Sequence, residues 1–208
     1  IFEEPYLGSM FKKISYDQIY DEHIFIFSVS AINKIAKIFD LDLVDVIEQP
    51  THGGSMRYVL SRKNKKPILK NVNYFLEKEK LNGHDTIEAG KTFKKDCETS
   101  RINLQNKING IKKQNKKIVG YAATSKSTTI LNYCDIGIES IDCIYDITKE
   151  KIGKYSPGKH IPIISHQNFI ENYPDYTYLF AWNHKEEIFK KEKDYVSKGG
   201  KWFSHVDL

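Results

Sequence analysis

Cysteine, tryptophan, methionine and proline are all scarce in this chain. Its 208 residues include three cysteines, two tryptophans, two methionines and six prolines. The cysteines, Cys97, Cys134 and Cys143, are odd in number, and none of them forms a C-x-x-C pair. Disulfide frameworks and cysteine zinc sites both use paired cysteines, so we predict three reduced core residues in a cytosolic protein and no metal site in this chain.

Long apolar runs and a signal-peptide pattern are also missing. A membrane-spanning helix needs about 18 or more consecutive apolar residues. The net charge is +5, but the lysines are scattered among acidic residues, and the densest run, at 112–117, stands just before an apolar strand. We interpret that run as a solvated helix end rather than a nucleic-acid surface. We therefore expect a cytoplasmic protein without membrane or nucleic-acid partners, whose basicity favours an anionic ligand.

The residues that are present suit a globular protein, since 40% are hydrophobic and 12% aromatic. Residues 1–5 are typical of a strand already ending, so we expect that a preceding portion is missing. Apolar residues at helical spacing predict a helix up to Phe39, capped by Ser28 or Ser30. Strands over 41–47 and 56–60 and helices over 68–81 and 86–115 complete the prediction for this half.

Beyond Lys117 short strands alternate with helices. The predicted strands cover 118–122, 141–145, 161–164, 176–182 and 202–206, and the predicted helices cover 128–135, 167–172 and 185–197. This alternation indicates βαβ units and a mostly parallel sheet. We therefore predict an α/β protein whose C-terminal half is Rossmann-like, with the helix over 86–115 linking the two halves.

One short stretch concentrates groups that can move protons. Residues 16–23 hold two phenols, three carboxylates and an imidazole, among them Tyr20, Glu22 and His23. His, Glu and Tyr side chains can pass or orient a proton once their surroundings tune them. The alternative is a polar entry to a helix, in which His23 caps the helix or is solvated.

A glycine turn follows in the first half. His52, Gly53, Gly54 and Ser55 lead into the second predicted strand, which carries Arg57. Two glycines let the backbone approach a ligand closely, and the guanidinium could hold a sugar or a phosphate. The alternative is a hairpin turn whose glycines only satisfy positive φ angles.

The first βα loop of the second half has the residues of a phosphate site. Ser125, Lys126 and Thr128 stand at a predicted helix N-terminus, where free amides and the helix dipole favour an anion. Asp146 ends the next strand and is either a ribose contact or a turn residue. The loop has no G-x-G-x-x-G pattern, which disfavours a nicotinamide oxidoreductase.

Two further segments end or begin predicted strands. His160 precedes one strand and either contacts substrate or caps that strand. Trp182 and Asn183 end another on the edge where ligands of such sheets collect, and the indole either stacks on a base or sugar or packs in the core.

Taken in order, four motifs resemble those of the S-adenosylmethionine-dependent sugar C-methyltransferases. They are Tyr20-Asp21-Glu22-His23, His52-Gly53-Gly54-Ser55-Met56-Arg57, Pro157-Gly158-Lys159-His160-Ile161-Pro162-Ile163 and Ala181-Trp182-Asn183. Those enzymes methylate the carbon next to the keto group of a nucleotide-linked 4-keto sugar. The resemblance implies that His23 is the base, that Glu22 orients it or shapes its charge, and that Tyr20 donates to the enolate or fixes the sugar.

The resemblance also implies a domain order. Residues 1–84 would be the end of a class I methyltransferase domain, and 85–208 the linking helix with a C-terminal domain for a nucleotide-diphosphate sugar. The family's loop after Lys126 usually has a glycine, where Ser127 stands here.

The family's glycine-rich S-adenosylmethionine motif and its zinc segment precede the region covered and do not appear in this chain. We therefore expect the 208 residues alone to bind S-adenosylmethionine poorly or not at all. A homo-oligomer is compatible with the sequence. A different class of function is also open, namely a non-catalytic module that binds nucleotide sugars.

Overall fold

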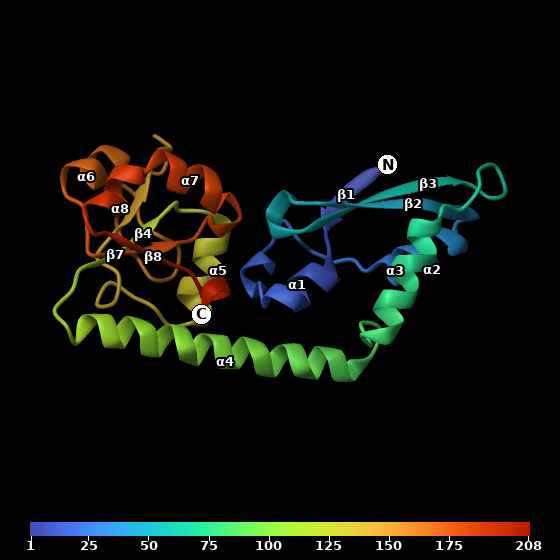
Figure 1. Cartoon of the computed structure of the whole chain (residues 1–208), viewed down its shortest axis with the longest axis horizontal. Coiled ribbons are helices and arrows are strands. Elements are labelled where there is room, and N and C mark those ends of the chain that lie inside the picture. Colours follow the sequence, from blue (N-terminus) through green and yellow to red (C-terminus); the bar gives the residue numbers. More distant parts are fainter. The chain divides into compact units, whose positions relative to one another are not determined.

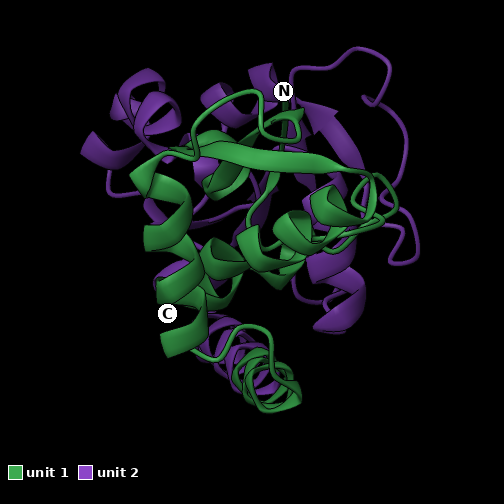
Figure 2. Ribbon diagram, turned by 90° about the vertical axis from the view of Figure 1, so that its right-hand side faces the viewer, with its two compact units in different colours: residues 1–97 green, residues 98–208 purple.

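The computed structural model describes all 208 residues and divides them into two compact units. Unit 1 comprises residues 1–97 and unit 2 residues 98–208 (Figure 2). The division falls inside α4 (Ile87–Lys112), close to the helix predicted over 86–115. Helix α4 buries one apolar stripe, formed by Cys97, Leu104, Ile108 and Ile111.

Unit 1 contains a three-stranded antiparallel sheet. Its strands are β1 (Phe2–Pro5), β2 (Leu41–Gln49) and β3 (Ser55–Arg62), in the order β1-β3-β2 (Figure 1). The predicted strands over 41–47 and 56–60 are thus confirmed. Both neighbours of β3 pair with it at Tyr58, which is fully buried.

Three helices accompany this sheet, namely α1 (Leu7–Lys13), α2 (Val29–Ile38) and α3 (Lys70–Leu81). Ser28 is the N-cap of α2, as predicted, and its Oγ accepts a hydrogen bond from the Ala31 N–H at 3.0 Å. The carboxylate of Glu79, from α3, accepts hydrogen bonds from the first two N–H groups of α2, those of Val29 and Ser30. The start of α2 is therefore fixed by a residue 50 positions away.

Unit 2 contains five parallel strands, as the alternation of strands and helices predicts. They are β4 (Ile118–Tyr121), β5 (Ile144–Asp146), β6 (Ile163–Ser165), β7 (Tyr176–Leu179) and β8 (Lys201–Phe203). In the order β6-β5-β4-β7-β8 the first strand, β4, lies in the middle of the sheet. The chain adds β5 and β6 on one side of β4 and then β7 and β8 on the other, and all neighbouring strands are parallel. This is the order of a doubly wound Rossmann-like sheet.

The helices of unit 2 depart from the predicted boundaries in two places. They are α5 (Ser125–Tyr133), α6 (His166–Glu171), α7 (Lys185–Lys191) and α8 (Lys193–Ser197). Helix α5 begins at Ser125 rather than at Thr128, because the Thr124 side chain accepts from the Ser127 N–H and caps the helix there. The single helix predicted over 185–197 is broken at Glu192, whose side chain turns into the core.

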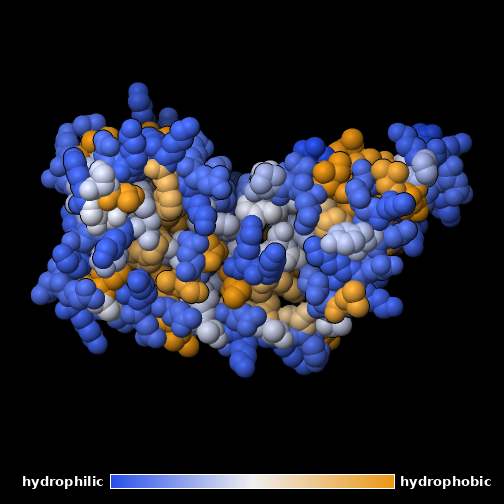
Figure 3. All heavy atoms as spheres, in the orientation of Figure 1, coloured by the Kyte–Doolittle hydropathy of each residue, from blue (hydrophilic) through white to orange (hydrophobic).

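The surface face shown in Figure 3 is mostly hydrophilic, with exposed apolar side chains in smaller groups. All three cysteines are buried, as predicted. The lysine-rich run at 112–117 begins with the last residue of α4 and is largely exposed, with Lys116 paired to Asp175 at 2.8 Å. None of the helices is both long enough and apolar enough to cross a membrane.

Candidate functional site

In unit 1 the candidate catalytic residues form a tight turn. The His23 N–H donates to the Tyr20 carbonyl oxygen at 2.9 Å. The ring nitrogen Nδ1 lies 2.8 Å from the Gln18 carbonyl oxygen, and Nε2 lies 3.2 Å from the Tyr20 hydroxyl. A carbonyl oxygen only accepts, so Nδ1 carries the hydrogen, and in the neutral ring Nε2 accepts from the phenol. The turn therefore presents a histidine in one defined tautomer.

Tyr20 supplies a protonated hydroxyl to this turn. Burial raises its pKa above the ordinary value for tyrosine, and the negative charges of Glu22, Asp17 and Asp21 raise it further. The phenol therefore keeps its proton at neutral pH. Glu22 is exposed, and no hydrogen bond or ion pair joins it to His23. The group that orients the ring is the main-chain carbonyl of Gln18, which the side-chain pattern of the sequence does not indicate.

The glycine turn lies beside this histidine. The ring of His52 meets the ring of His23 edge to face, with centroids 5.4 Å apart. His52 has φ 55° and Gly54 has φ 139°. A Cβ atom on Gly54 would lie 2.5 Å from the Ser9 side chain, so the glycine is needed both for its φ angle and for packing on α1. The glycines therefore satisfy positive φ angles, as in a hairpin turn, and binding of a ligand at this turn stays a prediction.

The other predicted residues of the turn have protein partners. The Ser55 side chain is buried, and its hydroxyl donates to the Thr51 carbonyl oxygen at 3.0 Å. Arg57 forms an ion pair with Glu3 at 2.9 Å. Gly53 accepts a hydrogen bond from the Lys13 ammonium through its carbonyl oxygen. These contacts fix the turn.

Unit 1 also has a pocket of about 900 Å³, which the candidate catalytic residues do not line. Its lining includes Gly54 and Lys13 but none of Tyr20, Glu22 or His23. Proton transfer needs a titratable group in hydrogen-bond reach of the reacting atom. The pocket has titratable groups of its own, among them His84, Glu48 and Asp96, so the catalytic centre at the His23 turn stays a prediction.

In unit 2 three predicted residues meet at the carboxyl edge of the sheet. Lys126 is 5% exposed, and its ammonium donates to Asn183 Oδ1 at 3.0 Å. The same nitrogen lies 4.6 Å from the centroid of the Trp182 ring. Lys126 stands in the first turn of α5, after β4, and the other two residues follow β7. This is the point where the strand order reverses, at which ligands of such sheets bind.

The remaining predicted residues of the first βα loop surround that point. Ser125 is exposed as the first residue of α5, and Thr128 follows within the next turn. Ser127 donates its hydroxyl hydrogen to the Thr124 carbonyl oxygen at 2.6 Å. The hydroxyl group at this position therefore reinforces the N-terminus of α5.

Asp146 holds the same loop from the neighbouring strand. Its two carboxylate oxygens accept from the main-chain N–H groups of Ala123 and Thr148, each at 2.7 Å. Burial acts to raise its pKa, but the hydrogen bonds from Thr148 and Ala123 and the charge of Lys151 outweigh burial and lower it. Ala122, just before, has φ 71°. These contacts are those of a turn residue, and a ribose contact stays a prediction.

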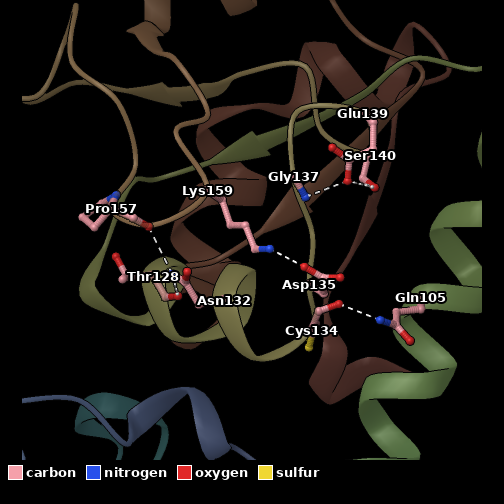
Figure 4. Close-up of polar contacts among 10 residues, drawn as sticks. All are labelled: Gln105, Thr128, Asn132, Cys134, Asp135, Gly137, Glu139, Ser140, Pro157 and Lys159. Carbon is pink, nitrogen blue, oxygen red and sulfur yellow. Dashed lines mark hydrogen bonds and ion pairs between the residues drawn. The ribbon is translucent and has the colours of Figure 1, made fainter.

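His160 lies at the opposite edge of the sheet. It is exposed and belongs to the segment that leads into β6, so it stands at the amino ends of the strands. Figure 4 shows this segment fixed to the far end of α5, where the Asn132 amide donates to the Pro157 carbonyl oxygen at 3.1 Å and Lys159 pairs with Asp135. The structure therefore does not bring His160 together with Lys126.

A polar cluster that the sequence did not single out occurs in unit 2. The buried carboxylate of Glu192 accepts from the Tyr121 hydroxyl at 2.7 Å and from His166 Nε2 at 2.6 Å. Tyr121 ends β4 and His166 directly follows β6, so both lie at carboxyl ends of strands. That position could have identified these two. Glu192 lies in a lysine-rich stretch that resembles a solvated helix, and no sequence signal marks it.

The chain has no group of three or more His, Cys, Asp and Glu side chains that could hold a metal ion.

Comparison with known proteins adds two findings. Residues 50–206 match the family described as the C-methyltransferase C-terminal domain. The chain is also 30% identical, over 201 residues, to C-methyltransferase NovU of Streptomyces niveus. That similarity covers 96% of this chain and 48% of NovU, so the chain spans about half the length of this relative. The family match includes the glycine turn and all predicted sites of unit 2, whereas Tyr20, Glu22 and His23 precede it.

Proposed function

The chain belongs to the C-methyltransferase C-terminal domain family, and on that premise we propose that the protein containing it is a sugar C-methyltransferase. It moves a methyl group from S-adenosylmethionine to the carbon next to the keto group of a nucleotide-linked 4-keto-deoxy sugar. The reaction passes through an enolate formed when His23 removes a proton. The observation that carries the proposal is the ring of His23, which is fixed by Gln18 and presents Nε2 to the Tyr20 hydroxyl.

Carbon methylation next to a carbonyl requires removal of a weakly acidic C–H hydrogen. In the proposal His23 Nε2 takes this proton, and the C–H electron pair becomes the enolate. Tyr20, no longer hydrogen-bonded to Nε2, donates its hydroxyl hydrogen to the enolate oxygen. The imidazolium that forms keeps its Nδ1–H bond to the Gln18 carbonyl oxygen. Base and donor thus come from one turn of four residues.

S-adenosylmethionine supplies an electrophilic methyl group for the enolate carbon when it is bound. Glycine-rich loops that hold such adenosyl groups join a parallel strand to a helix. All strand pairs of unit 1 are antiparallel. The proposal therefore assigns no contact with S-adenosylmethionine to the residues of unit 1.

Unit 2 supplies the site for the nucleotide diphosphate in this proposal. Lys126 and the positive end of the α5 helix dipole offer positive charge to phosphate oxygens. Asn183 and Trp182 hold the lysine in place. These groups lie together at the carboxyl edge of a doubly wound sheet, and this position supports their assignment to the diphosphate.

The proposal is tested by hydrogen exchange in D₂O. The complete protein is incubated with a nucleotide-linked 4-keto-6-deoxy sugar, and deuterium incorporation next to the keto group is followed by NMR. We expect exchange in the wild type and its loss in His23→Gln, with exchange retained in the control His84→Gln. Exchange that persists in His23→Gln would exclude His23 as the base. Tight sugar binding without any exchange in the wild type would favour the non-catalytic binding module instead.

A further inference from the structure

The cluster of Tyr121, His166 and Glu192 borders a second pocket, which lies in unit 2. This pocket has a volume of about 220 Å³. It opens at the carboxyl ends of the strands, since Ile147 follows β5, His166 follows β6, and Ala181 follows β7. Ligands in doubly wound sheets bind along this edge.

The hydrogen bonds of the cluster define how His166 faces the pocket. A carboxylate only accepts, so both the Tyr121 hydroxyl and His166 Nε2–H donate to Glu192 Oε1. In the neutral ring Nδ1 is then the acceptor, and this nitrogen has no hydrogen-bond partner in the protein. His166 therefore offers one oriented acceptor at a pocket that it lines.

The walls of the pocket suit a flat, mostly apolar ring. Two tyrosines, Tyr121 and Tyr145, line it together with small alanines and two isoleucines. Tyr121 meets the His166 ring at 90°, with centroids 5.8 Å apart. Aromatic side chains of this kind stack on or flank nucleobases, and a few polar atoms at the rim set their orientation.

The pocket also adjoins the proposed phosphate site through the chain itself. Ala122 lines the pocket and stands four residues before Lys126. Ala181 lines it too and directly precedes Trp182 and Asn183. A molecule with its phosphates at Lys126 thus has an aromatic pocket along the same two loops.

We propose that this pocket of unit 2 binds the nucleobase of the nucleotide sugar, and that His166, held by Glu192, accepts a hydrogen bond from an N–H group of that base. The inference rests on the proposed function, because it presupposes a nucleotide at Lys126. It extends that function by assigning base recognition to residues outside the four motifs.

Calorimetry with inorganic pyrophosphate, UDP and ADP on the full chain separates the base from the phosphates. Stacking of a base on an aromatic side chain strengthens binding by roughly tenfold or more. We therefore expect at least one of the two nucleotides to bind about tenfold more tightly than pyrophosphate. Equal binding of all three ligands would overturn the nucleobase site and leave the phosphate site standing. Binding of none, pyrophosphate included, would overturn the proposed function and the inference with it.

Two variants test the residues. In His166→Gln the glutamine amide replaces Nε2 toward Glu192 but removes the Nδ1 acceptor, so the preference for the nucleotide should fall several-fold without loss of folding. Ile147 is 70% exposed at the pocket, so Ile147→Glu leaves the core intact and should also weaken nucleotide binding. The matched control is Ile138→Glu, which changes an exposed isoleucine that does not line this pocket. An unchanged preference in both His166→Gln and Ile147→Glu would overturn the proposal.

Discussion

The Gln18 carbonyl oxygen lies 2.8 Å from Nδ1 of His23 and fixes which ring nitrogen carries the hydrogen. We expect the neutral His23 ring to be almost entirely in the Nδ1–H form, because a carbonyl oxygen cannot donate. Nitrogen-15 NMR of histidine-labelled protein above the histidine pKa measures the two tautomers directly. The exposed His160 is the internal comparison and should show a mixture. A mixture at His23 as well would contradict the assignment of Nε2 as the base.

Lys126→Met tests the phosphate site of unit 2. Methionine has a similar length and can keep the contact with the Trp182 ring, so the fold should be preserved. A hydrogen bond to a charged group contributes about 1.5–3 kcal/mol, and pyrophosphate binding should weaken by this amount. Calorimetry measures the change, with the exposed Lys193→Met as the matched control. If both variants bind pyrophosphate like the wild type, the anion site lies elsewhere.

The sequence predicts the sheet of unit 2 well because its strands are short apolar segments separated by helices. Parallel strands that are buried on both faces produce such continuous apolar segments, and the structure contains all five predicted strands. The break at Glu192 was missed for a physical reason. A lysine-rich segment with helical spacing indicates one helix, but the Tyr121 hydroxyl and His166 draw the carboxylate into the core. This tertiary contact overrides the local preference.

The candidate site was predictable where side chains mark it and not where the backbone does. The motifs lead to His23, Trp182 and Asn183, the first βα loop leads to Lys126, and the structure brings Lys126, Trp182 and Asn183 together. The partner of His23 is a main-chain carbonyl, which any residue at position 18 would supply. No side-chain pattern can reveal such a partner.

Asp146 should make the unfolding free energy of the chain depend on pH in the acidic range. Its pKa is lowered in the folded chain, so the carboxylate stabilises the fold fully above the unfolded value of about 3.9 and loses this effect as the pH falls through the folded pKa. The difference in unfolding free energy between wild type and Asp146→Asn should therefore be constant between about pH 5 and 8 and shrink below about pH 4. Urea denaturation at several pH values measures it. A difference that grows toward low pH would contradict the lowered pKa.

Glu79 should be among the most important polar residues for the stability of unit 1. Its side chain is 1% exposed, and its two oxygens accept from Val29 N–H at 2.7 Å and Ser30 N–H at 2.8 Å. Glu79→Ala leaves both N–H groups at the start of α2 without that partner and removes a negative charge from the positive end of the helix dipole. We expect a loss of about 3 kcal/mol in unfolding free energy.

The exposed Glu77, in the same turn of α3, offers the matched control for this prediction. Glu77→Ala should change the unfolding free energy by less than about 0.5 kcal/mol, because surface substitutions away from special contacts are nearly neutral. Urea unfolding followed by circular dichroism gives both values. Hydrogen exchange at the amides of Val29 and Ser30 locates the effect, since these two should exchange faster only in Glu79→Ala. Equal stability of the two variants would show that the start of α2 does not depend on the carboxylate from α3.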